Sequence, residues 1–330
     1  MIADSAPDPA ALTNRYRGRI QETLSELKNF APPCVGCGLF VTGQTAGAGE
    51  AMSPSCRATY NDLFKIGRTA QDESASDRTI DIKIAFGYMD FGKYTEDRYA
   101  SAALFDELMA PCSAGRFACG FKQDPDDADA VFKRITVLGP DGKIRHRQFR
   151  LQVHNSSFTD SEAANRTTSA QQQRRKTQEA QAFFDSALKN SDIVFYIGHA
   201  RDGGGPDFAP PVVSQQLHHA DYAWYHAHHP GVNEMNMDLL GAPHSPKILG
   251  LFACYAQNHF LNWLRSLAPK TGLILSGQQE FEASLGQAIA SLDSILGMRC
   301  EEQFNRAVDT ITNVNSTVIT PVKVDRVFSK

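Results

Sequence analysis

The chain has 330 residues, of which 42% are hydrophobic and 21% charged, so it can bury one large core or two modest ones. Its formal net charge of −4, without a basic stripe, predicts no binding to nucleic acid or to an anionic membrane. No apolar stretch approaches transmembrane length, and the first residues, MIADSAPDPA, lack the basic and apolar regions of a signal peptide. We therefore expect a cytoplasmic protein, with a mature exported form as the alternative.

The N-terminal part of the chain predicts one helix and then a Gly-rich loop. Residues 10–30 carry apolar side chains at helical spacing, and the segment APPCVGCGLFVTGQTAGAGE that follows breaks the pattern. We therefore divide the chain into a helical and Gly/Cys-rich extension, residues 1–78, and an α/β domain, residues 79–330.

From residue 79 onwards, strands and helices alternate. The predicted strands are 79–88, 149–158, 193–200, 247–256, 272–276 and 316–324, and the predicted helices are 98–110, 169–190, 257–268 and a long one through about 312. Such alternation implies a parallel sheet with right-handed crossovers. We expect an open, mostly parallel sheet of about six strands with helices on both faces.

Two insertions interrupt this alternation. Residues 112–148 contain Gly-Pro-Asp-Gly between two strand-like arms, which predicts a hairpin. Residues 201–246 are rich in histidine, a density compatible with Zn²⁺, Ni²⁺ or Cu²⁺, and include His218, His219, His226, His228 and His229. Because no HExxH spacing occurs and no carboxylate stands at a fixed offset, we expect no native metal and no cofactor, and favour a polar insertion that shapes a cleft.

The seven cysteines are too few for a disulfide scaffold, and their odd number leaves at least one thiol free. Cys34 and Cys37 have the spacing of a zinc knuckle, but a second CxxC is missing. A redox pair, a disulfide partner for Cys56 and plain loop cysteines are each at least as good an interpretation as a zinc site. Cys112 and Cys119 flank a turn-like segment and could be bridged in an oxidising compartment. Cys254 is the natural free thiol because it ends a strand.

Two apolar runs carry the strongest chemical signal. IVFYIGHA (193–200) contains His199 near its end, and KILGLFACYA (247–256) contains Cys254. Both runs lack polar alternation, as buried parallel strands do, and chemistry in such sheets collects at the carboxyl ends of strands. A thiol needs a base within hydrogen-bond reach to become a thiolate. The alternative interpretations are a buried hydrophobic cysteine and a histidine that only caps a loop.

The two runs resemble the diagnostic blocks of the caspase-like (clan CD) cysteine peptidases, which include caspases, legumains, gingipains and separases. That family has an apolar strand followed by His-Gly and another followed by Ala-Cys; here the first ends in His199-Ala200 and the second in Ala253-Cys254. The resemblance implies a peptide or protein substrate, Cys254 as nucleophile, His199 as acid and base, and an oxyanion hole formed by the backbone of Ala200 and Cys254.

Ala200 stands where the family has glycine, and glycine permits backbone angles that alanine resists. A weak or inactive module that binds a peptide or protein partner is therefore the first alternative. A metal-binding hydrolase built on the His-rich insertion is the second.

Three carboxylates are candidates for substrate binding. Glu280 and Glu282 belong to the segment after the 272–276 strand, and Asp207 follows the glycines after His199. A buried carboxylate in the specificity pocket would select Arg or Lys before the scissile bond. The alternative is that each is a solvated charge, which for Glu280 and Glu282 would lie at a helix start.

Overall fold

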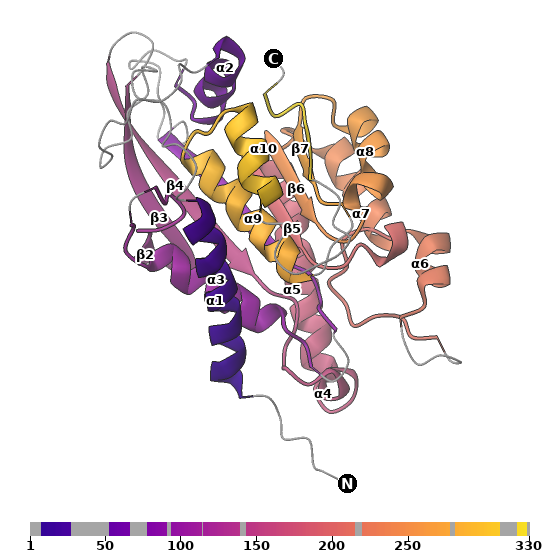
Figure 1. The fold of residues 1–330 in the computed structure, drawn as a ribbon. Coiled ribbons are helices and arrows are strands. Elements are labelled where there is room, and N and C mark those ends of the chain that lie inside the picture. The colour runs from indigo at the N-terminus through magenta and orange to yellow at the C-terminus, as the bar shows by residue number, and fades with distance from the viewer. Residues whose placement is uncertain are drawn as a thin grey trace.

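A central sheet positions the rest of the molecule (Figure 1). The computed structural model describes residues 8–27, 53–66, 78–90, 94–113, 115–138, 143–214, 220–277, 281–310 and 322–328. Within them the strands are β1 (Thr79–Phe86), β2 (Lys122–Asp124), β3 (Asp127–Leu138), β4 (Ile144–His154), β5 (Ile193–Ile197), β6 (Ile248–Phe252), β7 (Gly272–Leu275) and β8 (Lys323–Asp325). They form one eight-stranded sheet in the order β2-β3-β4-β1-β5-β6-β7-β8.

The middle of this sheet is parallel, as predicted. β4, β1, β5, β6 and β7 run in one direction, whereas β2, β3 and β8 are antiparallel to their neighbours. All residues of β5, β6 and β7 are buried, because helices cover both faces.

The expected number of about six strands is wrong, because the predicted hairpin belongs to the sheet. β3 and β4 form that hairpin, and β4 also pairs in parallel with β1, so the hairpin extends the sheet by β3 and then β2. The predicted insertion, residues 112–148, therefore overlaps the sheet at its C-terminal end, because β4 begins at Ile144.

Helices cover the sheet on both faces. α1 (Pro9–Leu27), α3 (Asp97–Met109), α9 (Phe281–Leu296) and α10 (Glu301–Thr310) contribute to one hydrophobic cluster, and α5 (Ala170–Asn190), α7 (Pro230–Gly241) and α8 (Ala256–Leu267) to the other. The remaining helices are α2 (Pro54–Leu63), α4 (Glu162–Arg166), α6 (Tyr222–His228) and a single 3₁₀ turn, η2 (Arg201–Gly203). No described helix is both long and apolar enough to cross a lipid bilayer.

The described part of the N-terminal extension shares its core with residues 79–330. α1 packs against α3 and α9, and the Tyr60 hydroxyl of α2 donates a hydrogen bond to the carbonyl of Arg299. The predicted long C-terminal helix is instead two helices, α9 and α10, because the chain turns at Gly297 and Met298, whose φ of 53° is left-handed.

Two disulfides lie within the described residues, and Cys254 is the free cysteine there. Cys112–Cys119 is the bridge that the sequence suggested. Cys56 pairs with Cys300, so its suggested pairing with Cys34 or Cys37 is wrong, and those two residues lie outside the described part of the chain.

Removing the Cys56–Cys300 bridge should destabilise the protein far more than removing the other bridge. The sequence separation is 244 residues for Cys56–Cys300 and 7 for Cys112–Cys119, and a longer closed loop restricts the unfolded chain more. We expect the Cys56→Ala/Cys300→Ala variant to lose about 3 to 5 kcal/mol of unfolding free energy, and Cys112→Ala/Cys119→Ala about 2 kcal/mol. Urea denaturation of both variants measures the difference, and equal losses would contradict it.

Candidate active site

His199 and Cys254 leave the sheet side by side. β5 and β6 are parallel neighbours, with Ile197 paired to Phe252. His199 lies two residues beyond Ile197 and Cys254 two residues beyond Phe252, so both occupy the same register position at the carboxyl edge of adjacent strands. Figure 1 shows β5 and β6 next to each other in the middle of the sheet.

Cys254 stands in a sharp strand-to-helix turn. The next residue, Tyr255, has a φ of 58°, a left-handed conformation that is uncommon outside glycine, and α8 begins directly after it. The Tyr255 amide donates to the Gly277 carbonyl, and the Ser276 hydroxyl accepts a hydrogen bond from the Ala253 amide at 2.8 Å. The partly buried thiol of Cys254 therefore lies just before the N-terminus of α8.

A carboxylate that sequence reasoning missed contacts His199. Asp90 follows β1, the strand on the other side of β5, and its Oδ1 lies 3.3 Å from His199 Nε2. Both side chains are largely shielded from solvent, with 24% of His199 and 13% of Asp90 exposed. Asp90, His199 and Cys254 thus come from three consecutive strands, β1, β5 and β6. Only its position shortly after a predicted strand could have singled out Asp90.

Arg201 joins Asp90 to a second carboxylate. Its side chain is 1% exposed; Nη2 lies 2.5 Å from Asp90 Oδ1, and Nε lies 2.8 Å from Asp207 Oδ2. The Tyr225 hydroxyl also donates to Asp207 Oδ2, at 3.0 Å. Burial lowers the pKa of Arg201, but Asp207 and Asp90 more than reverse this and raise it. Asp207, predicted to bind substrate, is therefore paired within its own loop, and its substrate role stays a prediction.

The same contacts keep Asp90 ionised. Burial alone would raise the pKa of this carboxyl, but the neighbouring His199 imidazole and the charge of Arg201 lower it to about 2. The Asp90 carboxylate is shared between Arg201 and His199, and its contact with Nε2 helps to orient the imidazole.

The acid stability of the protein should report this shift. A carboxyl with a lowered folded-state pKa stabilises the fold above its unfolded pKa, and that contribution is lost as the pH falls through the folded value. The shift from 3.8 to about 2 corresponds to about 2 kcal/mol. We expect the difference in unfolding free energy between wild type and Asp90→Asn to shrink by about that amount between pH 4 and pH 2. A difference that stays constant in urea titrations over this range would contradict the assignment.

The backbone at Ala200 is unstrained. Its φ of −82° and ψ of −12° are ordinary helical values, and the expectation that alanine here misplaces an oxyanion donor stays a prediction. The left-handed residues of this loop are instead Arg201, Asp202, Gly203 and Gly205. Within the described part of the chain, neither the Ala200 nor the Cys254 amide donates to a protein acceptor. The role of both amides as oxyanion donors stays a prediction.

The His-rich insertion packs beside this loop without forming a metal centre among the described residues. His229 Nδ1 lies 3.0 Å from the Gly203 carbonyl, and His226 Nδ1 lies 3.7 Å from Asp202 Oδ2. His228 stacks on Trp224. Burial lowers the pKa of His259, which packs against Gly203 and which the sequence did not single out.

Several predicted residues fall outside what the structure describes. They are His218, His219 and Glu280, together with the side chain of Glu282, whose backbone lies in the first turn of α9. Their proposed roles stay predictions.

Comparison of the chain with protein-family profiles, curated proteins and solved structures finds no match. The chemistry of the site therefore has to be inferred from its own residues.

Proposed function

We propose that this protein is a cysteine endopeptidase in which Cys254 is the nucleophile and His199 the general acid and base. The observation that carries the proposal is the shared register of these two residues at the ends of β5 and β6. The Asp90 carboxylate beside His199 adds the third group by which such sites orient the base. The caspase-like assignment is part of the same proposal, since the His and Ala-Cys blocks end adjacent parallel strands.

The reaction would proceed through an acyl-enzyme. His199 takes the thiol proton as Cys254 Sγ attacks the peptide carbonyl, forming a carbon–sulfur bond and a tetrahedral oxyanion. As the oxyanion collapses, the carbon–nitrogen bond breaks and His199 gives its proton to the leaving amine. Water then attacks the thioester, again losing a proton to His199, which returns it to the Cys254 sulfur as the acid product leaves.

Each surrounding group has a defined part in this scheme. Asp90 contacts His199 Nε2, so Nδ1 is the nitrogen we assign to the thiol. The amides of Ala200 and Cys254 would bind the developing oxyanion. The alternative of an inactive module that binds a peptide or protein partner differs from this proposal in the placement of the Ala200 donor, and the activity assay below separates the two. No described cluster favours the metal-dependent hydrolase.

The substrate would be a protein or peptide, and we retain cleavage after Arg or Lys as the proposed specificity. Asp207 is a weaker candidate than Glu280 or Glu282, because Arg201 and Tyr225 already hold its carboxylate. A pocket carboxylate would pair with the cationic side chain, and a neutral side chain would leave it unpaired.

A fluorogenic peptide library, varied at the residue before the cut, tests activity and specificity together. We expect turnover that is strongest for Arg and Lys and absent in Cys254→Ala. A preference for Asp or for apolar residues would contradict the acidic pocket and leave the peptidase assignment standing. No turnover of any peptide by folded protein with a reduced Cys254 would contradict the peptidase assignment itself.

A further inference from the structure

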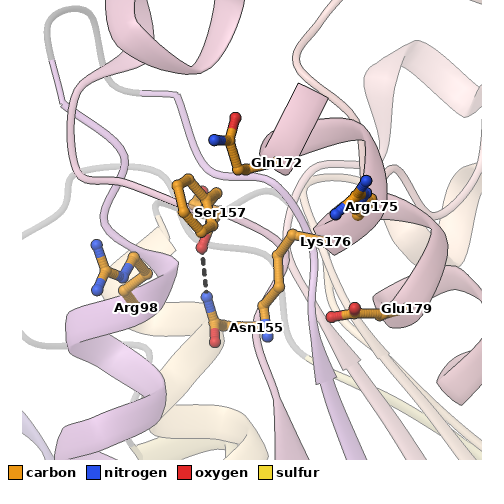
Figure 2. A pocket seen from close by; sticks show the side chains of 8 residues that line it. Arg98, Asn155, Ser157, Gln172, Arg175, Lys176 and Glu179 are labelled. Atoms are coloured by element: carbon orange, nitrogen blue, oxygen red, sulfur yellow. Dashed lines mark hydrogen bonds between the residues drawn. The ribbon is translucent and has the colours of Figure 1, made fainter. Parts of the chain in front are cut away.

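A second site lies at the same edge of the sheet, beyond β1. A pocket with a volume of about 430 Å³ opens where β4 ends, between the beginnings of α3 and α5 (Figure 2). This volume is within the range of small-molecule sites, about 300 to 1,000 Å³. The residues that matter here are Arg98, Asn155, Phe158, Arg175, Lys176 and Glu179. None of them belongs to the candidate active site.

The pocket carries unbalanced positive charge. Arg98, Arg175 and Lys176 form no ion pair with a carboxylate in the described part of the chain, whereas Arg166, just before α5, pairs with Glu162. Glu179 is the one acidic side chain in the lining, so the ionised side chains of the lining sum to +2; the buried Asp97 lies behind it, hydrogen-bonded to Ser157. Figure 2 shows Arg98 on one side of Asn155 and the α5 side chains on the other, with Lys176 extending toward Asn155. A dianion bound among them would relieve their mutual repulsion.

The pocket also offers an apolar surface. Phe158 is 42% exposed, one of the few large hydrophobic side chains so accessible among the described residues. A bare inorganic ion would leave this ring in water, whereas a ligand with an aromatic body could cover it. A ligand that used both features would combine an anionic head with an apolar body.

We propose that this pocket binds a small phosphate monoester with an aromatic or other apolar body. Such a group carries close to two negative charges above its second pKa of about 6, which matches the +2 of the lining. Arg98, Arg175 and Lys176 would hold the phosphate oxygens by charge-assisted hydrogen bonds. Phe158 would contact the body. A sulfate monoester carries a single charge and should bind more weakly.

Calorimetric titration of the full chain with phenyl phosphate at pH 7.5 and low salt tests the proposal. We expect saturable binding that weakens below about pH 6, as the second phosphate proton returns. Arg175→Ala and Lys176→Met should each weaken binding by about 5-fold or more. The matched control is Arg174→Ala, which removes an equal charge from the residue directly before Arg175. Arg174 is exposed and does not line the pocket, so its removal should change binding less than about 2-fold.

Two further variants separate the parts of the ligand. Glu179→Gln should tighten binding, because it removes the one negative charge of the lining. Phe158→Ala should weaken binding of phenyl phosphate and leave binding of inorganic phosphate unchanged. The proposal is overturned by the absence of saturable binding, by equal effects of Arg174→Ala and Arg175→Ala, or by phenyl sulfate binding as tightly as phenyl phosphate. Because Cys254→Ala should bind phenyl phosphate normally, the outcome is independent of the peptidase assignment.

Discussion

Replacing Cys254 by alanine should abolish peptide hydrolysis, and replacing His199 by alanine should lower kcat by about 100- to 10,000-fold. In the proposed mechanism, the first change removes the atom that would form the acyl-enzyme. The second removes the group that would move both protons, and a thiol without a neighbouring base is a poor nucleophile at neutral pH. Asp90→Asn keeps the size of the side chain and removes its charge, so we expect a smaller loss than for His199→Ala. Steady-state kinetics on the best library peptide measure all three.

Alkylation gives a second readout that needs no substrate. In unreduced protein, brief iodoacetamide treatment followed by mass spectrometry should label Cys254 before any other described cysteine, since the other four form disulfides. The informative comparison is between variants: labelling of Cys254 should slow in His199→Ala. Unchanged labelling would show that the imidazole does not activate the thiol, and residual hydrolysis by Cys254→Ala would exclude this cysteine as the nucleophile.

Replacing Arg201 by alanine should cost about 3 to 5 kcal/mol of unfolding free energy. The guanidinium is buried and pairs with both Asp90 and Asp207, so its removal leaves two shielded carboxylates without a cation. Urea denaturation measures the loss. A matched control is Arg306→Ala, which breaks the Arg306–Glu302 pair on the surface of α10. About two thirds of each side chain is exposed, so this change should cost less than about 1 kcal/mol of unfolding free energy.

Arg201→Lys keeps the prediction testable if Arg201→Ala fails to fold. A lysine preserves the charge, but it lacks the planar guanidinium that lets arginine pair with two carboxylates at once. The unfolding free energy of Arg201→Lys should therefore lie between those of wild type and Arg201→Ala. A loss no larger than that of Arg306→Ala would mean that Asp90 and Asp207 do not depend on Arg201. Hydrolysis should fall together with stability, because the loop that carries Arg201 also carries His199 and Ala200.

The parallel middle of the sheet could be predicted because its signals are local. β5 and β6 are short apolar runs, and each is followed within two residues by His199 or Cys254, so the ends of the runs place these residues at the sheet edge. The number of strands was underestimated because β4 pairs with two strands, β3 in the hairpin and β1 in parallel. The amino-acid pattern of one strand does not show how many neighbours it has.

Periodicity and composition report burial and strand ends, so the amino-acid pattern was enough to place a histidine and a cysteine at the ends of two buried parallel strands. The groups around them follow from the way the whole chain packs. Asp90 meets His199 across 109 residues of chain, and Cys56 meets Cys300 across 244. Such contacts depend on which loops the sheet order brings together, and on backbone angles such as those of Arg201 and Tyr255. Neither is encoded in local spacing, because both result from packing the whole chain into one sheet with helices on both faces.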